Sequence, residues 1–452
     1  MEDALKYYEY LENLQKQYRT TSTELLDELA AAGLAITKGN LSHKLKGQRR
    51  ISADELTVII QTICPTAAEE AELRRLFHIN MFGEERYLES ELIRRYIAQY
   101  TEETIRSIRK LPEIPENGGD LTTPDSVQAA VYAICERAWG RSCIRVMCQP
   151  QFRAMTDMLL NRSADASSEV RHLICFNNDP AQQYSGYNIQ CLFSADRLAL
   201  ANDRYTARFF YDKVDAHVNR YSLFPFFITA DDMLLLIAYD CKSGFLVRDP
   251  ALIRRMTDDF DRIWADSRLL LRRFESEAEC LQMLGDLESK TKENIYILRK
   301  GWYLPAGVSD DEMQRYMSQE IRGAGEMNNL RRRRKRRKLH FDLLHTDDDA
   351  QRFLETGVIP ELPAEAEPIP KGSREAVLRR AKQAMTYRSI QSGMLLMPKD
   401  FSLVCNDNGS VLLCHLKPNE RLCLATTERR LYQSVSSFFQ YLIQFGSTMD
   451  ND

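Results

Sequence analysis

The feature that most constrains this 452-residue chain is a unit of three short predicted strands and a helix that occurs twice. The first copy spans residues 225–264. Turns at Asp231–Asp232 and Lys242–Gly244 separate its strands, and the helix PALIRRMTDDFDRIW follows directly. Its apolar run MLLLIAY at 233–239 is too short to span a bilayer.

The second copy spans residues 400–443, with turns at Asn406–Gly409 and Lys417–Glu420 before its helix. We interpret the two stretches as a duplicated meander-plus-helix unit, and ordinary α+β patterning without duplication is the alternative. Two packed lobes would leave a cleft, a common site for a small ligand. The corresponding apolar pairs are Phe227/Leu403, Leu235/Leu412, Leu246/Leu422 and Phe260/Phe438.

Upstream of the first copy, predicted helices at 125–139 and 151–161 alternate with strands at 143–148 and 171–176. This alternation favours an α/β region with a central sheet. Hydrophobic residues make up 44% of the chain, which excludes wholesale disorder. The net charge of -4 excludes a protein that coats nucleic acid along its whole length, so any such contact must be confined to one module.

The first eighty residues predict five short helices and no strand. Thr21 and Glu24 form a capping box at the start of the second helix. Thr37 caps the third helix, whose Leu41 and Leu45 point inward. Short helices joined by a turn, with further helices closing the core, are typical of a helix-turn-helix layout. The segment 37–50, TKGNLSHKLKGQRR, has five basic residues and no acidic one, so the basic character is local.

The run from Thr21 to Ile60 resembles the lambda-repressor/Cro-like (XRE family) helix-turn-helix. The capped helix at 21–32, the Thr37 cap and the L-S-x-K-L-x-G core at Leu41–Gly47 carry the resemblance, although the AAAGLAI link before Thr37 is longer than usual in that family. The resemblance covers only about the first eighty residues. It implies a transcriptional regulator that binds operator DNA as a homodimer.

The resemblance assigns base reading to the first half of the third helix and backbone contact to Ser22, and the basic residues further on suit phosphates. A helical bundle used for protein contacts is the alternative. The expected base-contacting residues are Lys38, Asn40, Ser42 and His43. The expected phosphate-contacting residues are Thr21, Ser22, Lys44, Lys46, Arg49 and Arg50.

A second basic feature is the run RRRRKRRK. It suits phosphate contact or an anionic effector such as a nucleotide, and a solvated loop or helix face is the alternative. Its members are Arg331, Arg332, Arg333, Arg334, Lys335, Arg336, Arg337 and Lys338.

The domain organisation expected from these patterns is multidomain. It has an all-α helix-turn-helix domain over 1–80, a connector helix and linker over 81–120, a sensor-like α/β lobe over 121–290, and a second α/β lobe over 291–452. The connector helix is a candidate for dimerisation or for packing on the second domain.

No complete catalytic motif is present in the sequence. A duplicated α/β body invites comparison with phospholipase-D-like folds, whose nucleophile lies in an H-x-K-x4-D motif. Here His415 and Lys417 match its first half, but position 422 is Leu and the first copy has no matching histidine. The eleven cysteines include no C-x-x-C pair; Cys405, Cys414 and Cys423 are spaced nine apart and read as core residues. We therefore expect no catalytic residues, no metal and no cofactor, and a protein that is not an enzyme.

The leading hypothesis is a sequence-specific DNA-binding transcriptional regulator whose C-terminal α/β region senses a small-molecule or nucleotide effector or mediates oligomerisation. The alternative is an enzyme of nucleic-acid or nucleotide metabolism, or a phage-defence or toxin–antitoxin component with an autoregulatory helix-turn-helix. The acidic N-terminus lacks a signal peptide, so a cytoplasmic location without membrane contact is expected.

Overall fold

The structure is a computed structural model of the 452-residue chain. It describes residues 6–100, 112–149, 152, 158, 168–178, 186–212, 223–274, 279, 283, 291, 294–300, 307–309, 312, 340–345, 350–359, 367–384, 386–390, 395–398, 400–417, 420–445 and 447–448. The fold is multidomain and mixed α/β, as the sequence predicted. Two compact units divide it: Met1–Glu91 with Ser437–Gly446, and Leu92–Ser436 with Ser447–Asp452.

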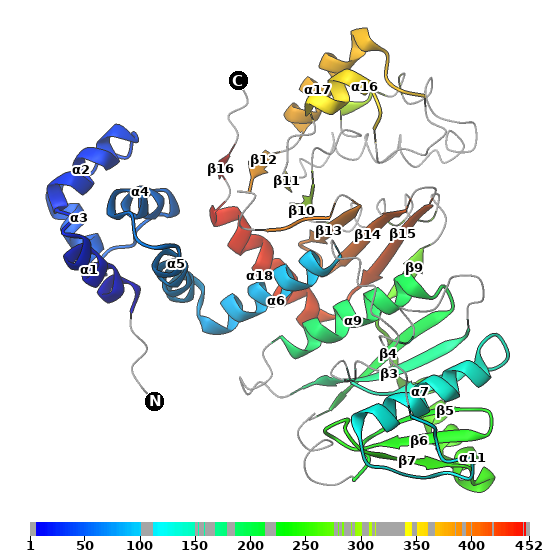
Figure 1. The fold of residues 1–452 in the computed structure, drawn as a ribbon. Coiled ribbons are helices and arrows are strands. Elements are labelled where there is room, and N and C mark those ends of the chain that lie inside the picture. The colour runs from blue at the N-terminus through cyan, green and yellow to red at the C-terminus, as the bar shows by residue number, and fades with distance from the viewer. Residues whose placement is uncertain are drawn as a thin grey trace. The chain divides into compact units, whose positions relative to one another are not determined.

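Five short helices form the N-terminal part of the first unit (Figure 1). Each helix from the second to the fifth begins after a Ser or Thr whose hydroxyl accepts a hydrogen bond from the backbone N–H three residues on. This confirms the predicted caps at Thr21 and Thr37, and such caps stabilise a helix by about 1 kcal/mol. The helices are α1 (Tyr7–Tyr18), α2 (Ser22–Ala31), α3 (Lys38–Leu45), α4 (Ala53–Ile63) and α5 (Ala67–Phe82).

Their apolar faces meet in one core, which includes the fully buried Leu11, Leu25 and Leu29 and also Leu41. The next helix, α6 (Glu84–Gln99), corresponds to the predicted connector. The division between the two units falls within α6, whereas the sequence suggested a domain boundary at residue 80. Among the described residues, no helix is both long enough and apolar enough to cross a membrane.

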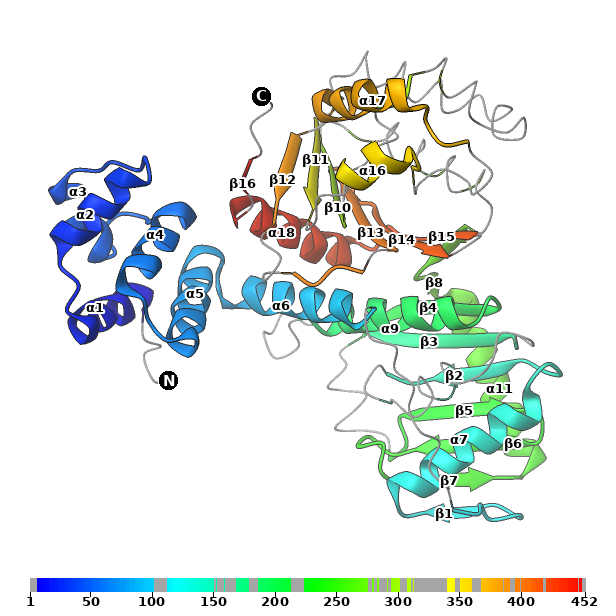
Figure 2. The ribbon, with the colours of Figure 1, turned by 45° about the horizontal axis from the view of Figure 1, so that its top comes forward.

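The second unit contains two eight-stranded sheets with the same topology (Figure 2). The first has the strand order β1-β7-β6-β5-β2-β3-β4-β8. Its strands are β1 (Gly119–Leu121), β2 (Ile144–Met147), β3 (Val170–Asn177), β4 (Tyr205–Asp212), β5 (Phe226–Ala230), β6 (Met233–Ile237), β7 (Gly244–Val247) and β8 (Arg268–Leu269).

The second sheet, read from its other end, has the matching order β9-β15-β14-β13-β10-β11-β12-β16. Its strands are β9 (Arg272–Phe274), β10 (Asn294–Arg299), β11 (His340–His345), β12 (Thr386–Ser389), β13 (Phe401–Asn406), β14 (Val411–Lys417), β15 (Glu420–Thr426) and β16 (Ser447–Thr448). In each sheet three parallel strands join an antiparallel meander, β2-β3-β4 with β5-β6-β7 and β10-β11-β12 with β13-β14-β15. The predicted duplication therefore extends over the whole of both sheets.

The helices occupy matching places in the two copies. A helix lies between the second and third parallel strands, α9 (Tyr187–Ala201) in the first copy and α17 (Lys371–Ala384) in the second. Another follows each meander, α11 (Pro250–Asp266) and α18 (Arg429–Phe445). In the first lobe, α7 (Pro124–Ala138) and α9 cover one face of the sheet and α11 covers the other (Figure 2). A further short helix, α16 (Ala350–Thr356), precedes α17.

Two boundaries differ from the sequence interpretation. The end of the segment 112–120 is not linker, because Gly119–Leu121 pairs with β7 as the short edge strand β1. The two sheets divide between β8 and β9 rather than near residue 290, since β9 pairs with β15 of the second sheet. Neither strand has the apolar alternation by which strands are predicted, since each is an edge strand fixed mainly by backbone pairing. The predicted helix at 151–161 lies largely outside the described residues.

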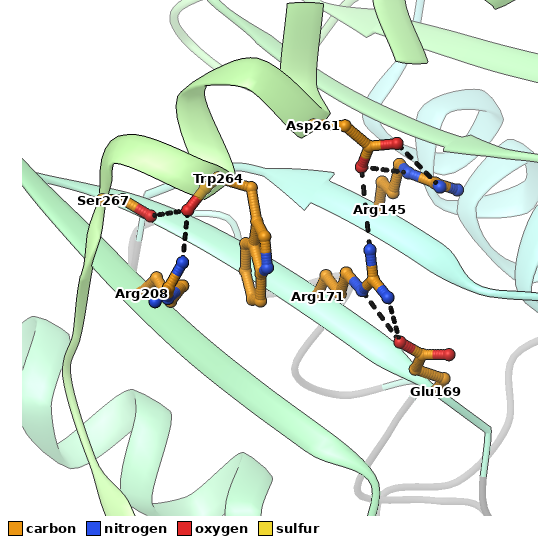
Figure 3. A network of polar contacts seen from close by, with 7 residues as sticks. All are labelled: Arg145, Glu169, Arg171, Arg208, Asp261, Trp264 and Ser267. Carbon is orange, nitrogen blue, oxygen red and sulfur yellow. Dashed lines mark hydrogen bonds and ion pairs between the residues drawn. The ribbon is translucent and has the colours of Figure 1, made fainter. Parts of the chain in front are cut away.

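Helix α11 is fixed to the first sheet by a polar cluster around Asp261 and by apolar side chains on the neighbouring turns. Asp261 accepts two hydrogen bonds from Arg145, at 2.9 and 3.0 Å, and lies 3.8 Å from Arg171 (Figure 3). The guanidinium groups of Arg171 and Arg208 lie 5.8 and 5.4 Å from the ring of Trp264. Phe260, one turn before, is fully buried.

Replacing Asp261 with Ala leaves Arg145 and Arg171, which are direct neighbours across β2 and β3, without their shared carboxylate. We expect the free energy of unfolding to fall by about 1–2 kcal/mol, because the paired groups are partly exposed to solvent. Urea denaturation measures the change. Asp259→Ala is the matched control. It removes an exposed pair with Arg262 on the same helix, and the expected loss is below about 0.5 kcal/mol. Equal losses for the two variants would contradict this role of Asp261.

Candidate functional site

Helix α3 presents polar side chains to solvent, while Leu41 is buried. Lys38, Ser42 and His43 are exposed, and Asn40 is half-buried. The side-chain oxygen of Asn40 accepts a hydrogen bond from Arg49 at 3.1 Å, and His43 Nδ1 is hydrogen-bonded to Gln48. The loop after α3 therefore folds back onto the helix, and Arg49 lies beside the predicted base-contacting residues.

Four cations on and after α3 are exposed, namely Lys38, Lys46, Arg49 and Arg50. None of them has an ion pair with a residue that the structure describes. We call this group of four residues the α3 cation set.

Lys44 does not belong to the α3 cation set, and the sequence prediction of a phosphate contact is corrected for it. Its Nζ lies 2.5 and 2.6 Å from the two carboxylate oxygens of Glu55 on α4, and the two side chains are only 15% and 8% exposed. Lys44 faces inward because it stands three residues after Leu41, on the inner side of the helix.

The two residues predicted to contact phosphate at the start of α2, Thr21 and Ser22, differ in whether their side chains already have a partner among the described residues. Ser22 is exposed, but the hydroxyl of Thr21 is engaged with Glu24: it accepts from the Glu24 N–H at 3.2 Å and donates to the Glu24 carboxylate at 2.9 Å. Asp27 and Glu28 are also exposed on α2. The positive surface is therefore restricted to α3 and the loop that follows it. The run 331–338 lies outside the described residues.

A second cluster lies where the two lobes meet. Asp196 on α9 of the first lobe is completely buried, and its Oδ1 lies 3.1 Å from Nε2 of His415 on β14 of the second lobe. Its Oδ2 accepts a hydrogen bond from the hydroxyl of Tyr100, which follows α6. The Tyr100 ring stacks on Phe401, the strand partner of His415. Burial, and then the Asp196 carboxylate, raise the pKa of Tyr100 well above its ordinary value.

Further polar contacts join the lobes. Arg430, near the start of α18, donates to the carbonyls of Asn177 and Asn178 at 2.7 and 3.0 Å, and Glu428 accepts from Tyr211. The sequence did not predict the His415–Asp196 pair, because 219 residues separate its members and no local spacing could reveal it. His415 was noticed only as half of a motif.

The cysteines of the second sheet and His172 of the first are buried or half-buried among neighbouring groups of the protein. Cys414 and Cys423 are strand partners whose sulfur atoms are 3.3 Å apart, and Cys405 is buried. Within the described part of the chain, no group of three or more His, Cys, Asp or Glu side chains could hold a metal ion. His172 on β3 is buried, with one ring nitrogen 2.7 Å from the Tyr205 hydroxyl and the other 3.1 Å from the carbonyl of Cys148.

Comparisons with known proteins give only distant similarity. No protein-family model and no curated protein matches the sequence. Among solved structures, a phospholipase D family member, Nuc from Salmonella typhimurium, is 9% identical; the match covers 40% of this chain and 97% of that one, with a TM-score of 0.24. Phosphatidylserine synthase of Haemophilus influenzae Rd KW20 is 12% identical over 75% of this chain and 89% of that one, with a TM-score of 0.24. TrmBL2, an archaeal chromatin protein, is 10% identical over 48% of this chain and 70% of that one, with a TM-score of 0.21.

These comparisons correct one expectation. The sequence interpretation that the chain is not an enzyme depended on the missing half of a local motif, whereas solved structures similar to the chain include a phospholipase D family member and a phosphatidylserine synthase. The expectation of a non-enzyme is withdrawn. At these TM-scores the similarity carries no argument about a reaction, a substrate or a residue of this chain.

The environment of His172 predicts a pH dependence of stability. Desolvation lowers its pKa from 6.5 to about 4 in the folded protein. The unfolded chain therefore takes up a proton at this histidine at a higher pH than the folded chain does. The contribution of neutral His172 to the free energy of unfolding is complete above pH about 6.5 and is lost as the pH falls toward 4. We expect the loss to be on the order of 3 kcal/mol. Urea denaturation at several pH values measures it, and His172→Gln should flatten the profile in this window. An unchanged profile would contradict the assignment.

Proposed function

We propose that this chain acts on nucleic acid through two separately built parts. The N-terminal helices bind duplex DNA in the manner of a helix-turn-helix, and the duplicated α/β body is an enzyme of nucleic-acid or nucleotide metabolism. The observation that carries the proposal is the α3 cation set, four exposed positive charges on and after one capped helix that form no ion pair with a described residue.

The composition of α3 supports the DNA-binding part. An eight-residue helix fits the major groove, where Ser42 and His43 can read base edges while Lys46 and Arg49 contact phosphates. The chain as a whole carries a net charge of -4, so the positive charge of α3 and its loop is a local feature. The exposed Asp27 and Glu28 on α2 repel phosphate, which limits the contact to α3 and its loop.

The His415–Asp196 pair supports the enzymatic part. Nε2 of His415 is held by the buried Asp196, and Nδ1 makes no hydrogen bond to a described residue. A histidine that is oriented by a carboxylate at one nitrogen can exchange a proton at the other, which is the arrangement of a general base. In phosphodiester hydrolysis such a group can activate the attacking nucleophile.

A transcriptional regulator is the second candidate. It would use the same DNA-binding part, with the body serving as a sensor in the cytoplasm and a homodimer binding two half-sites. The pair of lobes with a ligand-sized cavity favours this candidate. The two candidates differ in one observable property, since only the enzyme turns over a nucleic-acid substrate.

Replacing Lys46 or Arg49 with Ala should weaken binding to all duplexes similarly. Each substitution should lower the slope of log affinity against log salt by about 1, because one phosphate contact is lost. Ser42→Ala and His43→Ala should instead change the sequence preference, by about 1–3 kcal/mol for a strong base contact. Fluorescence anisotropy with labelled duplexes measures both effects.

Arg75→Ala is the matched control for this experiment. Arg75 is an exposed arginine on α5 whose charge is paired with Glu72, so its loss should leave DNA binding unchanged. If all four α3 and loop substitutions behave like the control, α3 is not the DNA-binding helix.

For the enzymatic part, His415→Gln should reduce cleavage of a fluorescent DNA oligonucleotide by about 100-fold or more, the usual contribution of a general base. Asp196→Asn should also lower the rate, since it removes the carboxylate that orients His415. His172→Gln is the control histidine: it lies outside the lobe junction, and at pH 7.5 its cleavage rate should equal that of the parent chain. Undiminished cleavage by the His415 variant would exclude the pair as the catalytic group. Absence of cleavage by the parent chain, with DNA binding intact, would favour the regulator.

A further inference from the structure

A cavity of about 450 Å³ lies at the edge of the second sheet, beside the last strand of the first. Its lining comes from β8 and the residue after it, from β9, and from the start of β14 and the end of β15. Its volume lies in the range of small-molecule binding sites. None of its lining residues belongs to the α3 cation set or to the His415–Asp196 pair.

Apolar side chains contribute to the floor of the cavity. Arg272 of β9 is the strand partner of Ala425, which in turn pairs with Leu412, so these three side chains lie in one row on the same side of the sheet. Phe274, two residues further along β9, also points to this side, and Leu270 is buried nearby. Such a floor suits the flat or apolar body of a ligand.

Three side chains in the lining can donate hydrogen bonds and make none to a described residue. Arg272 is exposed. Its guanidinium lies 4.9 Å from the centre of the Phe274 ring, and it makes no hydrogen bond or ion pair with a described residue. The hydroxyls of Ser410 and Thr427 likewise make no hydrogen bond to a described residue. The neighbouring Arg273 differs, because it donates to the carbonyl of Ala199 at 2.5 Å and to Asp203 at 2.7 Å.

We infer that this cavity binds the phosphate ester of a small metabolite, with the phosphate on Arg272, Ser410 and Thr427 and the body on Leu412 and Ala425. A guanidinium and two hydroxyls supply donors to three oxygens, which matches a terminal phosphate better than a two-oxygen carboxylate. Glu279 also lines the cavity, and its carboxylate disfavours a ligand that carries several more negative charges.

The site does not depend on the proposed function, because it can be tested without DNA and without a reaction. Isothermal titration calorimetry of the full chain uses adenosine 5′-monophosphate as the probe of a phosphate ester with a flat body, and adenosine as the same body without phosphate. We expect the monophosphate to bind at least ten-fold more tightly than adenosine, the usual gain from a charge-assisted hydrogen bond.

Arg272→Gln should weaken binding of the monophosphate by about ten-fold or more, and Thr427→Val by a smaller factor of about 2–10. Both side chains are exposed, so neither substitution should impair folding, which an unchanged thermal melt verifies. Arg254→Gln is the matched control, an exposed arginine of α11 outside the cavity, and it should bind like the parent chain.

Two results would overturn the inference. One is the absence of binding to the parent chain at millimolar monophosphate. The other is equal affinity of the Arg272 and Arg254 variants, which would mean that the ligand binds elsewhere.

Discussion

A carboxylate that is fully removed from water must be matched by donors, because an unpaired buried charge costs several kcal/mol. Asp196 is 0% exposed, and both of its donors, His415 and Tyr100, come from outside the sheet-and-helix lobe to which it belongs. The two sheets cannot separate at this point without depriving Asp196 of its hydrogen bond to His415. The relative placement of the lobes, and with it the cavity beside β9, depends on this contact and on the arginine-to-carbonyl contacts that accompany it.

The parts of the fold that are encoded locally could be predicted from the sequence. The caps at Thr21 and Thr37 and the two meanders are set by neighbouring residues, and the structure has them where the sequence indicates. Long-range pairing could not be predicted in the same way. The His415–Asp196 pair joins residues from two lobes, and the Lys44–Glu55 pair crosses from one helix to the next. Spacing in the sequence indicates neither contact. The mistaken expectation of a non-enzyme came from local motifs alone, because only the first half of one catalytic motif was present.

The structure separates two kinds of positive charge. In the second unit, several arginines bind carboxylates or backbone carbonyls within the protein. Arg145 and Arg171 bind Asp261 of α11, while Arg273 and Arg430 join the lobes. On α3 and its loop the α3 cation set is left to solvent. Arginines that satisfy buried carboxylates and carbonyls contribute to stability, whereas exposed cations without a carboxylate partner within ion-pair distance can neutralise phosphates. This difference is the physical basis of the proposal that the N-terminal helices bind nucleic acid.

The most direct test of this account is an anisotropy titration of the full chain with a labelled duplex from its own upstream region, at two salt concentrations and against an excess of an unrelated duplex. The account predicts binding that weakens with salt, with a slope that corresponds to about three or four phosphate contacts, and that survives the competitor. Binding that is independent of salt, or that the competitor abolishes, would contradict the proposed role of α3.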